Sequence, residues 1–422
     1  MASQDSSAFT RPALLLGLLF LALIAMFYRA SGYDLQSLWL AAAFFENGPA
    51  AVYAVSGDTF QMKPPDAWMA AVLAGETTSA IYPYIYPPIW AWALAPLTDA
   101  IDFQAFLLGM SFLNAALVTA MVYLAWRIAS PGLPALAFIG ICAVIAMTSL
   151  VVLLPLSEAQ PQIIVSFLIL LGIERDKSNH PIIGGAAMAL AAAIKLYPLI
   201  FALFWLCGGR RATFSSFVIT GAALGLTSLA VAGWPMHAAF LHEISAISGT
   251  VLTSLAIFSL DPLLAVMLIG TENMASVTTQ ATGGATGWQV YAKPALWSVI
   301  SLGVQLVTIA GLGWLAWKTR LKDPLFWPLA FIAIAWVSPL SWLYHYMTAI
   351  FFLPALLHRF GTVSGILLSF LIVIPTNLGV RTFLSALFDS PLAIVATTNA
   401  ALLLAAIAFF LAVIRSQRPF QT

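Results

Sequence analysis

The chain has 422 residues, of which 62% are hydrophobic and only 8% are charged. A soluble domain carries about 25% charged residues, so this composition excludes an ordinary soluble protein. The formal net charge of +1 gives no basic field for binding nucleic acid. We therefore expect a single all-α polytopic membrane domain over residues 1–422, with membrane lipid around it and no nucleic-acid partner.

Apolar runs of the length that crosses the hydrocarbon core as a helix recur along the chain. Lysines and arginines gather in the short turns between these runs, and the positive-inside rule places such turns in the cytoplasm. About 12 transmembrane helices with both termini cytoplasmic satisfy this pattern. The predicted helices are 12–30, 103–127, 134–154, 160–173, 181–194, 197–208, 214–234, 292–317, 325–338, 345–358, 361–376 and 391–414.

Two long segments are expected outside the membrane. The first, 31–87, contains an amphipathic-looking stretch at 35–45, and an apolar piece at 86–98 follows it. The second, 235–291, contains an apolar piece at 251–270 that Asp261-Pro262 interrupts, which predicts a re-entrant or interfacial segment. Several predicted helices are shorter than a full crossing, and short helices are tolerated where they line protein or a water-filled cavity. This predicts a cavity on the external side.

Asp34 lies a few residues beyond the first predicted helix. A carboxylate at this place has two interpretations. It is a general base at the boundary of water and lipid, or it is an ordinary interfacial group. Because ionisable groups near the membrane cost free energy, the residues expected beside Asp34 decide between the two.

Further polar and aromatic residues are expected on the same external face as Asp34. Each has an ordinary alternative: tyrosines and tryptophans anchor helix ends, lysine snorkels to headgroups, and a glutamate or histidine faces external water. Together, a cation and a histidine opposite a carboxylate favour a substrate with a phosphate group. The residues are Tyr86, Glu158, Gln160, Lys195, Tyr197, Trp342, His345, Tyr346 and Arg381.

The order of several short motifs resembles glycosyltransferase family 87, the polyprenyl-phosphate-mannose-dependent α-(1,2)-mannosyltransferases of the GT-C superfamily. The motifs are Tyr86-Pro87-Pro88 with Ala95-Pro96-Leu97, Lys195-Leu196-Tyr197-Pro198 before Arg210-Arg211, and Ser338-Pro339-Leu340-Ser341-Trp342 before His345. The resemblance extends from about residue 30 to 360. Two positions depart from it: Ala159-Gln160 replaces the usual Gly-Gln, and Tyr344 stands where relatives often have another histidine.

The resemblance implies transfer of a hexose, mannose, from a polyprenyl-phosphate donor to a hydroxyl of a lipid, glycan or protein acceptor. The reaction would take place at the periplasmic face of a cell membrane, the bacterial inner membrane. Asp34 would act as general base in an inverting single displacement, and His345 would contact the departing phosphate. From side and charge alone, Lys195 and Arg381 are expected to bind that phosphate. Glu158, Gln160, Tyr86, Tyr197, Trp342 and Tyr346 are expected to bind substrate.

The absence of an Asp-x-Asp motif predicts a reaction that needs no metal or other cofactor. Two other functions share the topology. A transporter or flippase for a lipid-linked or hydrophobic solute fits twelve helices equally well, but no internal repeat is visible and few ionisable residues lie in mid-helix. A lipid-linked glycan polymerase or ligase would favour more arginines in the external segments.

Overall fold

The computed structural model describes residues 3–53, 64–65, 67–68, 81–129, 132–278, 285–387 and 391–416. Most of these residues are helical. The principal helices are α1 (Ser3–Phe27), α2 (Tyr33–Ala43), α3 (Pro49–Val52), α5 (Pro88–Ala100), α6 (Phe103–Ala129), α7 (Ala135–Thr148), α8 (Leu150–Ser157), α9 (Gln162–Lys177), α10 (Pro181–Ile194), α11 (Pro198–Cys207), α12 (Arg211–Ser248), α13 (Leu260–Leu268), α14 (Ala295–Thr319), α15 (Phe326–Val337), α16 (Met347–Ile350), α17 (Ala355–Phe360), α18 (Thr362–Val373), α19 (Leu378–Leu387) and α20 (Pro391–Ser416).

Five helices in the described part of the chain are long and apolar enough to cross a membrane. They are Thr10–Phe27, Phe103–Ala129, Arg211–Ser248, Ala295–Thr319 and Ile394–Ser416. Shorter apolar helices, such as α10 and α15, pack among them. The chain is thus a multi-pass helical membrane protein, as its composition predicts, while the number of twelve crossings stays a prediction.

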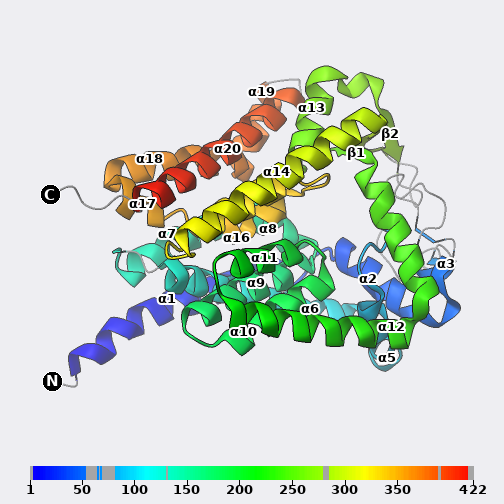
Figure 1. Ribbon diagram of the computed structural model, residues 1–422, viewed down its shortest axis with the longest axis horizontal. Helices are drawn as coiled ribbons and strands as arrows, with labels where there is room; N and C mark the ends of the chain where they lie inside the picture. The colour runs from blue at the N-terminus through cyan, green and yellow to red at the C-terminus, as the bar shows by residue number, and fades with distance from the viewer. Residues whose placement is uncertain are drawn as a thin grey trace.

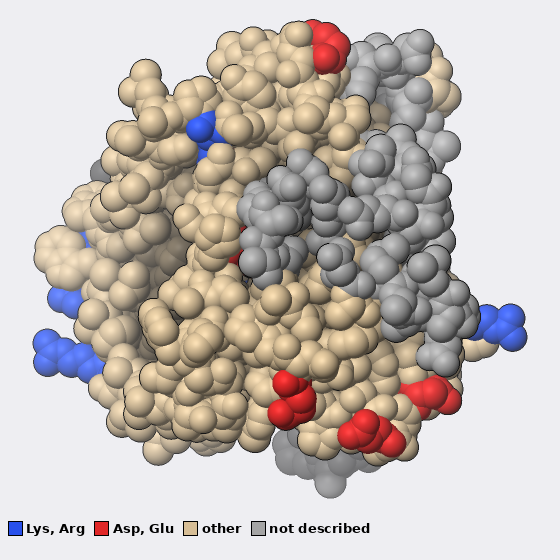
Figure 2. Space-filling view, turned by 90° about the vertical axis from the view of Figure 1, so that its right-hand side faces the viewer, with Lys and Arg blue, Asp and Glu red and all other residues tan. Residues whose placement is uncertain are grey.

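The outer ends of α1 and α20 lie at the same end of the molecule, and the strands lie at the opposite end (Figure 1). Helix α12 connects the two ends with a sharp bend that Figure 1 shows in green. The bend falls at Gly233, whose φ of 71° and ψ of 166° are not helical, and Pro235 follows it without a backbone N–H to donate. Seen from the end with the strands, the described surface is mostly uncharged, with acidic side chains along the lower edge (Figure 2).

Several predicted segments differ from the structure. The helix predicted at 134–154 is divided at Ser149, whose backbone is extended and whose hydroxyl accepts from the Val151 N–H. The helix predicted at 345–358 consists of short turns, η5 (Leu343–Tyr346), α16 and α17. The amphipathic-looking stretch at 35–45 forms α2, which is buried continuously from Leu35 to Ala42 and so belongs to the core.

The apolar piece at 251–270 does not form one re-entrant segment. It is divided between strand β1 (Thr250–Thr253) and helix α13, and β1 joins β2 (Ala275–Thr278) and β3 (Ala285–Ala292) in an antiparallel sheet of order β1-β3-β2. Asp261, near the start of α13, is buried and accepts from Lys293 Nζ at 3.0 Å, Trp297 Nε1 at 2.8 Å and Ser301 Oγ at 2.6 Å. These bonds satisfy the carboxylate that interrupts the apolar run, and they fix α13 against the start of α14.

Candidate active site

A cavity of about 240 Å³ lies where α2, the sheet and the turns after α8 and α10 meet. It brings together residues that are far apart in the sequence. Of the predicted site residues, it is lined by Asp34, Tyr86, Glu158, Gln160, Lys195 and Trp342. The predicted convergence of polar groups on one cavity is therefore present for these six residues.

Asp34 enters the cavity from the first turn of α2. Gly32 precedes the helix with a φ of 66°, and a side chain there would come within 2.6 Å of Leu107. The Gly32 N–H donates to the Ser157 carbonyl at 3.1 Å, which attaches the start of α2 to the end of α8. The partial positive charge at a helix N-terminus favours the ionised carboxylate of Asp34.

Gln160 holds the Asp34 carboxylate in place. Its Nε2 donates to Asp34 Oδ2 at 2.5 Å and to the Tyr344 hydroxyl at 3.0 Å, while its Oε1 accepts from the Tyr86 hydroxyl at 2.7 Å. The carboxylate accepts only, so these partners fix which end of the amide is nitrogen. Both ends of the Gln160 amide are thus engaged within the protein.

Lys195 follows the end of α10 with an extended backbone, which turns its side chain into the cavity. Its Nζ lies 5.4 Å from the centre of the Tyr86 ring and 5.2 Å from that of Tyr344, within the range of cation–π attraction. Burial lowers the pKa of Lys195 to about 8, although the Asp34 charge opposes the shift. Burial likewise raises the pKa of Asp34 to about 6, against the opposing effects of Lys195 and the Gln160 hydrogen bond.

Four aromatic rings form a wall of the same cavity, from Tyr82 through Trp288 and Trp342 to Tyr344. Tyr82 stacks on Trp288 with ring centres 5.6 Å apart, and Trp288 meets the edge of Trp342 at 5.1 Å. Trp342 and Tyr344 are nearly parallel at 6.0 Å. The sequence drew attention to Trp342 but not to Trp288, because strand β3 was not predicted.

Three predicted site residues, His345, Tyr197 and Tyr346, do not line this cavity. His345 and Tyr197 line a second cavity of about 90 Å³, and their rings meet edge to face with centres 5.7 Å apart. Tyr346 is fully buried and donates to the Phe258 carbonyl at 2.5 Å. Arg381 lies in α19, and its side chain is outside the described part of the structure.

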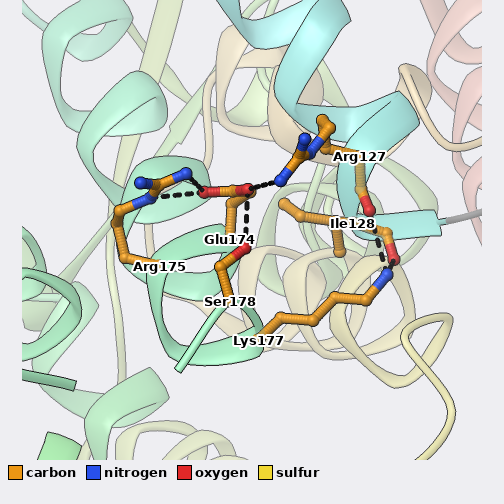
Figure 3. Close-up of polar contacts among 6 residues, drawn as sticks. All are labelled: Arg127, Ile128, Glu174, Arg175, Lys177 and Ser178. Atoms are coloured by element: carbon orange, nitrogen blue, oxygen red, sulfur yellow. Dashed lines mark hydrogen bonds and ion pairs between the residues drawn. The ribbon is translucent and has the colours of Figure 1, made fainter. Parts of the chain in front are cut away.

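A Glu-x-Asp sequence, Glu174-Arg175-Asp176, lies at the end of α9 that is far from Gln160. Figure 3 shows Glu174 held between Arg127 and Arg175, with Ser178 donating to it at 2.9 Å. Lys177 Nζ donates to the Arg127 and Ile128 carbonyls, which ties α9 to the end of α6. This cluster joins helix ends. Among the residues that the structure describes, no group of three or more His, Cys, Asp or Glu is arranged to hold a metal ion.

The fold and the cavity define a class: a multi-pass membrane protein with a carboxylate, a lysine and aromatic rings in one cavity at the end that carries the sheet. The sequence model of glycosyltransferase family 87 matches residues 84–339, more than half of the chain. The chain therefore belongs to glycosyltransferase family 87 and is a membrane glycosyltransferase. A comparison with curated proteins gives no match. Asp34 and Trp342 lie outside the matched residues.

Proposed function

We propose that this protein transfers a hexose, mannose, from a polyprenyl-phosphate donor to a hydroxyl group of a lipid, glycan or protein acceptor. In this proposal Asp34 is the general base of an inverting single displacement. The observation that carries it is the Asp34 carboxylate in the central cavity, oriented by Gln160 and facing Lys195 and the aromatic wall.

The chemistry of the proposed step follows from these groups. Asp34 takes the proton of the acceptor hydroxyl, whose oxygen attacks the anomeric carbon as the bond from that carbon to the phosphate oxygen breaks. A pKa of about 6 leaves Asp34 mostly ionised at neutral pH and makes it a stronger base than an ordinary aspartate. The negative charge that develops on the departing phosphate is then stabilised by a cation.

Lys195 is the proposed cation, because its ammonium group lies in the same cavity as the base. Arg381 remains a second proposed phosphate-binding residue on charge alone. We propose that the reaction needs no metal or other cofactor, since a lysine supplies the positive charge. Turnover is expected to be unchanged in excess EDTA and to gain nothing from added Mg²⁺ or Mn²⁺, and a loss of turnover on chelation would contradict this.

The aromatic wall supports a sugar as the transferred group. The C–H faces of a hexose stack on aromatic rings, and its hydroxyl groups need polar partners, which the cavity also provides. Trp342, Tyr86 and Glu158 keep the predicted role of binding substrate in this proposal. Gln160 and His345 have indirect roles, because Gln160 orients Asp34 and His345 packs edge to face on Tyr344 at 5.0 Å.

We place the protein in a cell membrane, the bacterial inner membrane, with cytoplasmic termini and the cavity facing the periplasm. The test of the function is incubation of the purified protein in lipid vesicles with polyprenyl-phosphate mannose, radiolabelled in the sugar, and membrane extract as the source of acceptor. We expect label on a new product. Label that crosses the vesicle membrane unchanged would instead support the flippase alternative, and transfer of a preassembled oligosaccharide would support the polymerase or ligase.

A further inference from the structure

We propose that Glu158 is protonated when the donor binds and donates a hydrogen bond from its carboxylic acid to the donor phosphate. This inference rests on the proposed function, since it concerns the same polyprenyl-phosphate donor. It gives the second carboxyl group of the cavity a task different from that of Asp34. Three observations carry it: the backbone that directs Glu158 inward, a carboxyl oxygen without a partner, and the charges of the cavity.

The turn after α8 directs Glu158 into the cavity. Ala159 has a left-handed backbone with a φ of 46°, and the Gln160 N–H reaches back to the Pro155 carbonyl at 2.9 Å. Ser31 Oγ and the Gly32 N–H both donate to the Ser157 carbonyl, at 2.7 Å and 3.1 Å. The segment that carries Asp34 is therefore attached to the segment that carries Glu158, and the two carboxyl groups are held in one site.

The carboxyl group of Glu158 has an unused oxygen. Its Oε2 is shielded from solvent and has no hydrogen-bond partner among the described residues. An ionised carboxylate oxygen in such a place loses its hydration without replacement, which is costly. A protonated acid has a donor at this position instead, and that donor needs an acceptor from a molecule in the cavity.

The surroundings favour the proton on Glu158 over one on Asp34. Burial is the main cause that raises the pKa of Glu158 to about 8, and the Asp34 charge adds to it, while Ser157, Ser31 and the Tyr33 N–H oppose the shift. Lys195 and the Gln160 hydrogen bond instead favour the ionised form of Asp34. Near neutral pH the pair therefore holds one proton, mainly on Glu158.

The negative charge of the donor phosphate favours a neutral Glu158. The ionisable groups that line the cavity together with Glu158 are Asp34, Lys195 and the phenols of Tyr82, Tyr86 and Tyr344. A sugar linked to polyprenyl phosphate is a phosphodiester with one negative charge. If both carboxyl groups were ionised, Lys195 would face three negative charges, whereas a neutral Glu158 removes one of them and supplies a hydrogen bond.

The experiment compares Glu158→Gln and Glu158→Ala with wild type in transfer of radiolabelled mannose from polyprenyl-phosphate mannose, with the donor KM measured between pH 6.5 and 9. The amide of glutamine is neutral and donates through its N–H, so Glu158→Gln should keep kcat/KM within about threefold of wild type at pH 7. Glu158→Ala should raise the donor KM about tenfold with a smaller change in kcat.

The pH dependence separates a proton on Glu158 from a structural role. Above pH 8 the donor affinity of wild type should fall as two protons are released, one from Glu158 and one from Lys195. In Glu158→Gln the affinity should fall with the release of one proton. This readout needs only the glutamine variant, so it stands even if Glu158→Ala fails to fold.

Three results would overturn the inference. Glu158→Gln that is as impaired as Glu158→Ala would show that an ionised carboxylate is needed. A normal donor KM in Glu158→Ala would show that Glu158 does not contact the donor. If the same number of protons is released in Glu158→Gln as in wild type, Glu158 is not one of the groups that titrate. Each of these leaves the proposed function intact if wild type transfers mannose, whereas a wild type that transfers none overturns the function and this inference together.

Discussion

At the scale of single residues, the Asp34 carboxylate is oriented by Gln160 and shares its cavity with Lys195. The charge pattern of the sequence predicts that Asp34, Lys195 and Gln160 lie on the same side of the membrane, so these residues could be expected together. The Gln160 amide makes hydrogen bonds of 2.5–3.0 Å with Asp34, Tyr86 and Tyr344. The spacing of residues in the sequence does not reveal these bonds. The same holds for His345, whose position one residue after Tyr344 directs it to the second cavity.

Replacement of Gln160 tests its control of the base. The Gln160 hydrogen bond lowers the pKa of Asp34, so Gln160→Ala should raise that pKa above its present value of about 6. Because the base works in its ionised form, kcat/KM should fall more at pH 6.5 than at pH 8, by about tenfold or more at the lower pH. The measurement is the pH profile of mannose transfer.

Gln162→Ala is the matched control for this experiment. Gln162 is the first residue of α9, and its Nε2 donates to Ser166 and Tyr197, neither of which lines the cavity that holds Asp34. Gln162→Ala should keep the acid limb of the wild-type pH profile of mannose transfer. If both variants lose activity equally at all pH values, Gln160 supports the turn and not the carboxylate.

At the scale of elements, long apolar helices could be predicted well because their length and hydropathy are properties of the sequence alone. α6, α10 and α14 lie within a few residues of their predicted bounds. The sheet could not be predicted in the same way, since β1 and β2 have four residues each and β1 pairs with a distant part of the chain, as Thr250 does with Ala292. Trp288 lies in β3, so this residue of the cavity could not be predicted either.

The turn between α8 and α9 contains Ala159 at a position where glycine fits best. Ala159 is fully buried with a φ of 46°, a conformation that costs an L-residue about 1–2 kcal/mol and a glycine little. Ala159→Gly should therefore stabilise the folded protein by up to about 1 kcal/mol, part of the relief being offset by the greater freedom of the unfolded chain.

Thermal unfolding in detergent, with mannose transfer measured in parallel, checks this prediction. Ala159→Val is the useful contrast, since a β-branched side chain is still less compatible with that backbone and should lower the unfolding temperature. A destabilised glycine variant would show that Ala159 is held by packing of its methyl group.

Helices α9, α10 and α12 approach closely through glycines. A methyl group at Gly185 of α10 would overlap the Thr213 carbonyl oxygen and the Phe217 nitrogen of α12. Gly185→Ala should therefore destabilise the protein by about 1–3 kcal/mol or more. This change would also displace the end of α10 that carries Lys195, so activity should fall with stability.

Gly303→Ala provides the comparison, because nothing lies within 4 Å of the position that its methyl group would take on α14. It should change stability by less than about 1 kcal/mol. The measurement is the unfolding temperature of the two variants. If both lower it equally, the close contact of α10 and α12 is not the cause of the destabilisation.

At the scale of the whole molecule, ion pairs join helix ends, and one cavity gathers residues from distant parts of the chain. Arginine-rich ion pairs such as Arg127–Glu174 and Arg359–Asp323 fasten helix ends, and the cavity lies where α2 meets the turns after α8 and α10. The composition was enough to predict a membrane protein, and the family match establishes a glycosyltransferase. The shape of the cavity could not be predicted, because it depends on how α2 and the sheet pack against those turns.

The central claim is that Asp34 is the base of mannose transfer, and one assay tests it most directly. Wild type, Asp34→Asn and Asp34→Glu are compared for transfer of radiolabelled mannose from polyprenyl-phosphate mannose, with folding checked by unfolding temperature. Asparagine can accept the Gln160 hydrogen bond through its amide oxygen, but it cannot take a proton from the acceptor. The kcat of Asp34→Asn should therefore fall by at least about a thousandfold. Asp34→Glu keeps a carboxylate and should retain measurable turnover. A folded Asp34→Asn with turnover near that of wild type would contradict the account.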